Sequence, residues 1–140
     1  MNLNTDNIKH IAIIMDGNRR WAKVRGETHV FGHKNGAETL IKIAKYAKSI
    51  GIKYLTVYAF SKENWNRTEE EVSYLMKLLE SYANEILKKT RKELEGGKIK
   101  FIGNFENVDK NIVKLIKDVE ESTKDNEEFC LDIYRLHLIF

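Results

Sequence analysis

Short apolar runs alternate with longer amphipathic stretches along this sequence, and this alternation constrains the fold most. The runs at 8–15 and 54–60 are continuous and rich in β-branched or aromatic residues, as in strands that are buried on both faces. The longer stretches repeat apolar residues at helical spacing. The predicted strands are 8–15, 54–60, 98–103 and 129–133, and the predicted helices span 33–50, 68–95 and 108–119. The order β-α-β-α-β-α-β predicts an α/β protein with a mostly parallel sheet and helices on both faces.

The composition is that of a globular domain. The chain has 140 residues, of which 42% are hydrophobic and 32% charged, and a net charge of +3. A chain of this size and polarity can bury a core, which a disordered protein cannot, and residues 1–140 are expected to form a single domain. The near balance of charge argues against a nucleic-acid-binding arm, which would carry clustered excess positive charge. The basic stretch at 88–92 is interpreted as the solvated end of a helix, where cations suit the helix dipole.

The cysteine content and the hydropathy indicate the compartment. Cys130 is the only cysteine, so an internal disulfide and a Cys-based zinc site are excluded and a reducing compartment is expected. No apolar run approaches the ~20 residues that a membrane span needs. Residues 1–9 are polar and lack the apolar core of a signal peptide. These features predict a cytoplasmic protein.

The turn after the first predicted strand reads Asp16-Gly17-Asn18-Arg19-Arg20-Trp21. Ligands of open parallel sheets bind at the carboxyl ends of the strands. Gly17 permits a tight turn, and Arg19 and Arg20 offer paired donors that match phosphate oxygens. Asp16 could hold a Mg²⁺ ion that bridges to a diphosphate. The alternative is an ordinary polar turn with two solvated arginines, because short glycine-containing motifs often match by chance.

Two histidines, His29 and His33, follow this turn. His33 could contact a phosphate or cap the helix predicted over 33–50, and for a lone histidine the structural role is favoured. We reject a metal site formed by the two, because no third ligand lies nearby in the sequence and Gly32 between them weakens a helix.

The segment after the second predicted strand, 60–68, reads FSKENWNRT. It combines acidic, basic, amide, hydroxyl and indole groups, which is a higher density of functional groups than most connections have. Glu63 or Asn64 could position a proton transfer, and Arg67 could hold phosphate. The alternative is a polar connection in which Trp65 folds back onto the core.

Three longer strings point to a known family. Residues 10–22 read HIAIIMDGNRRWA, residues 31–36 read FGHKNG and residues 58–67 read YAFSKENWNR. In this order and at these intervals, the sequence resembles the cis-prenyltransferases, which form the undecaprenyl diphosphate synthase or isoprenyl transferase family. The resemblance covers about residues 8 to 133. It implies the undecaprenyl diphosphate synthase-like fold, of which this sequence holds only the N-terminal part.

The resemblance also implies a reaction and its partners. The family condenses isopentenyl diphosphate with an allylic diphosphate such as farnesyl diphosphate, using Mg²⁺. The product is a membrane-associated cis-polyprenyl diphosphate, here expected to be the undecaprenyl diphosphate of cell-wall carrier lipid. The family forms homodimers, but much of the interface lies in blocks that this sequence lacks. Nucleic acid is not an expected partner, and no transmembrane segment is expected.

The same resemblance implies roles for individual residues. Asp16 is the catalytic aspartate and the Mg²⁺ ligand, and Asn64 holds the position of the proton acceptor. The implied substrate-binding residues are Gly17, Asn18, Arg19, Arg20, Trp21, His29, His33, Ser61, Lys62, Glu63, Trp65 and Arg67. The chemistry is consistent, because an ionising allylic diphosphate needs its leaving oxygens neutralised by metal, arginines and amides.

The sequence departs from the family pattern in three places. His29 stands where the family usually has arginine, and Thr68 replaces a proline. After Ile133 the family continues into a glycine-glycine-arginine block and then into the arginines, serine and glutamate that bind isopentenyl diphosphate and a second Mg²⁺. This sequence contains none of these. We therefore expect the 140-residue chain to be weakly active or inactive, because catalysis needs both diphosphates in register.

Two alternatives to an enzyme of this kind follow from the same residues. The chain could be a non-catalytic partner subunit or an inactive fragment that binds only the allylic diphosphate. Against a non-catalytic subunit, Asp16 and Arg20 are both present, and such a subunit would not need them. A phosphatase of the Asp-x-Asp type is disfavoured, because Asn18 stands where the second aspartate should be.

Overall fold

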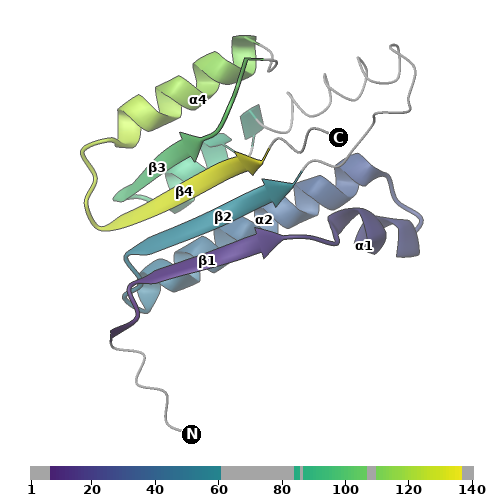
Figure 1. Ribbon diagram of the computed structural model, residues 1–140, viewed down its shortest axis with the longest axis horizontal. Helices are drawn as coiled ribbons and strands as arrows, with labels where there is room; N and C mark the ends of the chain where they lie inside the picture. The colour runs from purple at the N-terminus through teal and green to yellow at the C-terminus, as the bar shows by residue number, and fades with distance from the viewer. Residues whose placement is uncertain (1–6, 61–83, 86, 107–109, 137–140) are drawn as a thin grey trace, which may run out of the picture.

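A computed structural model describes residues 7–60, 84–85, 87–106 and 110–136 (Figure 1). The elements are β1 (His10–Met15), α1 (Asn18–Val24), α2 (His29–Ser49), β2 (Tyr54–Phe60), β3 (Gly97–Ile102), α4 (Lys110–Thr123) and β4 (Phe129–Leu136). A helical stretch at 87–93 precedes β3. The four described strands form one sheet in the order β1-β2-β4-β3, and every neighbouring pair is parallel. The predicted α/β class with a parallel sheet is confirmed.

One face of the sheet carries the hydrophobic core. Leu55 and Val57 of β2 are fully buried and cluster with Ala44 and Ala47 of α2. The small alanines let α2 lie close to the strands, and Figure 1 shows α2 crossing behind β1 and β2. Burial of these apolar side chains removes them from water, which is the main favourable contribution to folding.

A second cluster attaches α4 along the outer side of β3 (Figure 1). It joins Ile99 of β3 to Ile116 and Val119 of α4. The hydroxyl of Thr123 accepts a hydrogen bond of 3.1 Å from the backbone N–H of Ile99. A side chain of α4 therefore satisfies a backbone donor of β3, the last strand in the sheet order.

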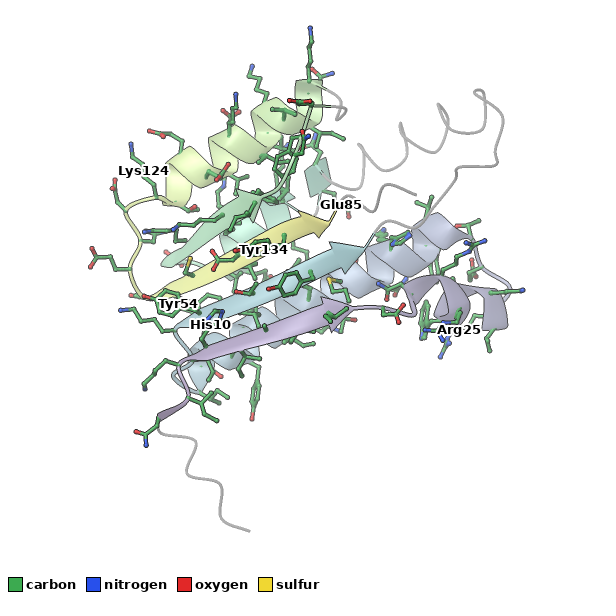
Figure 2. The ribbon with its side chains drawn as sticks, in the orientation of Figure 1. His10, Arg25, Tyr54, Glu85, Lys124 and Tyr134 are labelled. Atoms are coloured by element: carbon green, nitrogen blue, oxygen red, sulfur yellow. The ribbon has the colours of Figure 1, made fainter. Side chains whose placement is uncertain are left out.

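The opposite face of the sheet is more polar and aromatic. His10, Tyr54 and Tyr134 lie on this face in Figure 2, and Tyr54 is 41% exposed. The sequence predicted helices on both faces, whereas no helix of the described residues packs on this one. In β1 the burial alternates along the strand, and Ile14 is 63% exposed. Among the described residues, the face of β1 that carries Ile14 is therefore left uncovered.

Several element bounds differ from those predicted. The chain forms a separate short helix, α1, before α2. Helix α2 begins at His29 rather than at residue 33, because the Thr28 side chain caps it by accepting a hydrogen bond of 3.2 Å from the Phe31 N–H. Strand β4 continues past residue 133 to Leu136, which pairs with Phe60 of β2. Most of the helix predicted from residue 68 lies outside the described residues.

None of the described helices combines the length and the apolar character that crossing a bilayer requires.

Candidate functional site

The register of β1 and β2 brings the two candidate loops to one edge of the sheet. Met15, the last residue of β1, pairs with Ala59, and β2 ends one residue later at Phe60. Asp16 therefore follows β1 at the same edge at which β2 ends. Both are carboxyl ends of parallel strands, where ligands of such sheets bind.

The second candidate loop itself falls outside the described residues. This applies to Ser61, Lys62, Glu63, Asn64, Trp65 and Arg67. Their roles in substrate binding and proton transfer stay predictions.

The turn between β1 and α1 depends on Gly17. Its φ of 88° and ψ of 0° lie in the left-handed region that favours glycine. In this conformation the Gly17 N–H donates a hydrogen bond of 2.7 Å to Oδ1 of Asp16. The tight turn expected at Gly17 is present, and its backbone fixes one carboxylate oxygen of Asp16 at the end of β1.

Arg20 lies one helical turn beyond and interacts with the other carboxylate oxygen. Its Nη2 is 3.3 Å from Oδ2 of Asp16, and the two side chains are 78% and 77% exposed. Such an exposed ion pair contributes about 0–1 kcal/mol, so an incoming anion can replace the carboxylate as the partner of Arg20 at little cost. Asp16 and Arg20 thus lie side by side at the carboxyl end of β1.

Two glycines of α2, Gly32 and Gly36, allow α1 to pack closely against α2. No packing role was predicted for either glycine. A β-carbon on Gly32 would lie 3.0 Å from Cβ of Ala22, and one on Gly36 would lie 2.7 Å from Oδ1 of Asn18. Real β-carbons essentially never show the Gly36 distance, and the Gly32 distance is tighter than nine in ten real β-carbon contacts. The four-residue spacing of these glycines places them on one helix face, and this spacing is the signal that could have revealed the contact.

A cavity of about 370 Å³ lies between the Asp16 turn, β1 and α2. Its polar end is formed by the Asp16 turn with Asn18 and Asn35, and its other walls are largely apolar. The lining residues are Ile13, Ile14, Met15, Asp16, Gly17, Asn18, Trp21, Asn35, Gly36, Thr39, Leu40 and Ile43. A cavity with one polar and one apolar end suits a ligand that has a charged head and a hydrocarbon tail.

Trp21 stands at the rim of this cavity. Its ring stacks on Phe31 of α2 with ring centroids 6.0 Å apart and an angle of 17°. The guanidinium of Arg25 lies over the Trp21 ring, 4.1 Å from its centroid, in a cation–π contact. These contacts fix the indole beside the Asp16 turn, and its role in substrate binding stays a prediction.

The structure corrects the structural role considered for His33. His33 lies inside α2, beyond the first turn, so the helix cap is Thr28 and not His33. His29 is the first residue of the same helix, which Gly32 does not interrupt. Among the described residues, no group of three His, Cys, Asp or Glu side chains could hold a metal ion. The contribution of His29 and His33 to substrate binding stays a prediction.

Comparison with known proteins identifies the family. Residues 14–135 match the family model described as "Putative undecaprenyl diphosphate synthase". The chain belongs to this family. It is 53% identical over 127 residues to the isoprenyl transferase of Fusobacterium nucleatum, covering 89% of this chain and 54% of the relative. It is 44% identical over 131 residues to the ditrans,polycis-undecaprenyl-diphosphate synthase, (2E,6E)-farnesyl-diphosphate specific, of Micrococcus luteus, covering 93% and 52%.

Solved structures of this family have the same fold. The crystal structure of lavandulyl diphosphate synthase from Lavandula x intermedia in complex with dimethylallyl diphosphate matches with a TM-score of 0.74 and 31% identity, over 91% of this chain and 54% of that one. A probable undecaprenyl diphosphate synthase from Campylobacter jejuni matches with a TM-score of 0.61 and 28% identity, over 93% and 55%. The chain spans about half the length of these relatives. The predicted membership and fold are confirmed.

Proposed function

We propose that this protein acts in prenyl transfer, in which isopentenyl diphosphate condenses with an allylic diphosphate to give a cis-polyprenyl diphosphate. The main support is the Asp16 turn at the carboxyl end of β1, where Arg20 lies beside the carboxylate and a cavity with apolar walls adjoins it. The names of the relatives agree, since one is specific for farnesyl diphosphate and one structure holds dimethylallyl diphosphate. We propose farnesyl diphosphate as the allylic substrate, undecaprenyl diphosphate as the product and the cytoplasm as the location.

In this proposal the allylic diphosphate lies at the polar end of the cavity. Arg20 turns its guanidinium from Asp16 to the phosphate oxygens, a change that costs little because the ion pair is exposed. The planar guanidinium donates paired hydrogen bonds that match two phosphate oxygens. The hydrocarbon tail lies against Met15, Leu40 and Ile43, where its burial is favourable.

The residues present fit a Mg²⁺ ion. Magnesium is held in many phosphate-transferring sites by one or two carboxylates, with substrate phosphates and waters completing the shell. Asp16 offers an exposed carboxylate for this, and the diphosphate would supply further oxygens. When bound, the ion would neutralise the charge that develops on the leaving diphosphate. Asp16 would hold the ion, and the Gly17 N–H fixes the orientation of its carboxylate.

The described residues carry the allylic half of the proposed site, because Asp16, Arg20 and the adjoining cavity lie together at the carboxyl end of β1. We therefore expect this chain to bind farnesyl diphosphate.

The deciding experiment is an assay with farnesyl and labelled isopentenyl diphosphates and Mg²⁺, run beside the Asp16→Ala variant and beside a farnesyl diphosphate binding measurement. Weak turnover that the variant lacks, with retained binding, supports the proposal as stated. Rapid turnover supports prenyl transfer but contradicts the expected impairment. Absence of both turnover and binding overturns the proposal.

A further inference from the structure

Helix α1 presents an exposed apolar side chain between two cations. Val24 is 83% exposed, and its neighbours in the sequence, Lys23 and Arg25, are exposed as well. Ala22, two residues before Val24, is fully buried where α1 packs against α2. Because two residues turn a helix by about 200°, Val24 lies on the side of α1 that faces away from α2.

Contacts within the protein hold a cation and an aromatic ring near this valine. Nη1 of Arg25 donates a hydrogen bond of 3.2 Å to the carbonyl oxygen of Trp21, and the Arg25 guanidinium lies over the Trp21 ring. The same ring stacks on Phe31, which is 37% exposed. Trp21 and Val24 are neighbours on the helix surface, since they are three residues apart. We define the α1 face as Lys23, Val24, Arg25 and Phe31, and leave out Trp21 because it lines the cavity.

The charge around the α1 face is positive, whereas the opposite end of the molecule is acidic. Residues 17–31 contain four lysines and arginines and one acid, and residues 118–128 contain six acids and one lysine. Helix α1 follows the carboxyl end of β1, while residues 124–128 precede the amino end of β4. Figure 2 accordingly shows Arg25 and Lys124 at opposite ends of the molecule. An anionic surface would attract the α1 end and repel the other end.

A lipid surface fits this face better than a protein partner does. A specific protein interface usually buries more than about 1,000 Å², whereas α1 is a helix of seven residues. Binding to a bilayer surface needs only apolar side chains at the boundary of headgroups and acyl chains, with lysines and arginines around them. Each such cation near an anionic leaflet strengthens binding about fivefold.

We propose that the α1 face docks on the surface of an anionic lipid bilayer. Val24 and Phe31 enter the boundary between headgroups and acyl chains, where they lose contact with water. Lys23 and Arg25 bind lipid phosphates at the level of the headgroups. The carboxyl edge of the sheet then faces the bilayer, and the acidic segment 118–128 faces away from it. The inference rests on exposure and charge and does not depend on the proposed catalytic function.

Vesicle sedimentation tests the proposal. The full chain is mixed with vesicles of phosphatidylcholine alone, or of equal parts of phosphatidylcholine and phosphatidylglycerol. We expect binding to the anionic vesicles that is at least tenfold tighter than binding to the neutral ones. The double variant Lys23→Glu/Val24→Asp should bind the anionic vesicles at least tenfold more weakly than the wild type. Hydrogen exchange of the wild-type chain should slow at the α1 amides when anionic vesicles are added, but not at the α4 amides.

A matched control separates the α1 face from the net charge of the chain. Lys42→Glu/Tyr46→Asp makes the same change of charge at exposed residues of α2, and it should bind nearly as the wild type does because salt screens charges beyond about 10 Å.

Three results would overturn the proposal. The first is absence of binding to anionic vesicles, which would leave a protein as the partner of this face. The second is equal binding to neutral and anionic vesicles. The third is an equal effect of the two double variants. If the α1 variant fails to fold, the exchange measurement on the wild-type chain decides, and protection that spares α1 would then overturn the proposal.

Discussion

The side chain of Asn18 occupies the space beside Gly36, with its Oδ1 2.7 Å from the point at which a β-carbon of Gly36 would stand. Asn18 is the first residue of α1 and directly follows the Asp16-Gly17 turn. The turn that carries the candidate catalytic aspartate is therefore held in place by a helix contact that requires glycine. A substitution on α2 can disturb Asp16 without touching it.

Gly36→Ala should destabilise the protein by up to about 2 kcal/mol, measured by urea unfolding. The added methyl group overpacks the contact with Asn18, which costs about 1–3 kcal/mol, while alanine in a helix returns roughly 1 kcal/mol. In an Asn18→Ala background the obstacle is gone, and Gly36→Ala should then be neutral or stabilising. An equal loss in both backgrounds would contradict the packing described here.

Gly32→Ala provides the contrasting case. The obstacle there includes the backbone carbonyl of Asn18 and Cβ of Ala22, neither of which Asn18→Ala removes. The net loss of stability, up to about 2 kcal/mol after the same return of roughly 1 kcal/mol from helix propensity, should therefore persist in the Asn18→Ala background. Rescue of Gly32→Ala by that substitution would show that the two glycines do not act as described.

Thr123→Val should destabilise the protein by about 1–3 kcal/mol. Thr123 is 3% exposed, and its hydroxyl accepts the Ile99 N–H and donates to the Val119 carbonyl. Valine has nearly the same shape but leaves the Ile99 N–H without its partner. The neighbouring exposed substitution Ser122→Ala should change the unfolding free energy by less than about 0.5 kcal/mol. Similar effects of the two substitutions would contradict the role given to Thr123.

Cys130 should make stability depend on pH in the alkaline range. Burial, followed by the nearby charge of Asp132, raises the pKa of the Cys130 thiol from its ordinary 9.0 to about 11. Between these values the folded state holds a proton that the unfolded chain has released, so stability falls as pH rises from 9 to 11. Below pH 9 this thiol contributes no pH dependence.

The pH dependence is measured as the difference in unfolding free energy between the wild type and Cys130→Ala. Because both proteins contain the same lysines and tyrosines, the contribution of these groups cancels when the two unfolding free energies are subtracted. The difference should be constant below pH 9. Above pH 9 the unfolding free energy of the wild type should fall relative to that of Cys130→Ala. A difference that stays constant up to pH 11 would contradict the raised pKa.

The fold was predictable because its main signals are local. The β-branched run ending at Met15 and the helical spacing that ends at Gly51 both predicted elements that the structure contains. The parallel sheet followed from their alternation. The covering of the sheet is harder to predict, because an apolar strand residue such as Ile14, which is 63% exposed among the described residues, has the same sequence signal whether or not another segment packs on it.

The local geometry of the candidate site was predictable, but the contacts that hold it in place were not. Asp16, Gly17 and Arg20 are adjacent in sequence, so the local turn brings them together directly. The contact of Asn18 with Gly36 joins residues that are far apart in sequence, and no local propensity reports it. The glycine spacing in α2 indicated only that something could approach closely, not what does.

The central claim is that the Asp16 turn holds an allylic diphosphate, and calorimetry with farnesyl diphosphate and Mg²⁺ tests it most directly. The wild-type chain should bind, and Asp16→Ala should bind at least tenfold more weakly. Glu121→Ala, which removes an equally exposed, ion-paired acid on α4, should bind as the wild type does. Absence of binding by the wild type, or equal affinities of the wild type and Asp16→Ala, would contradict the claim.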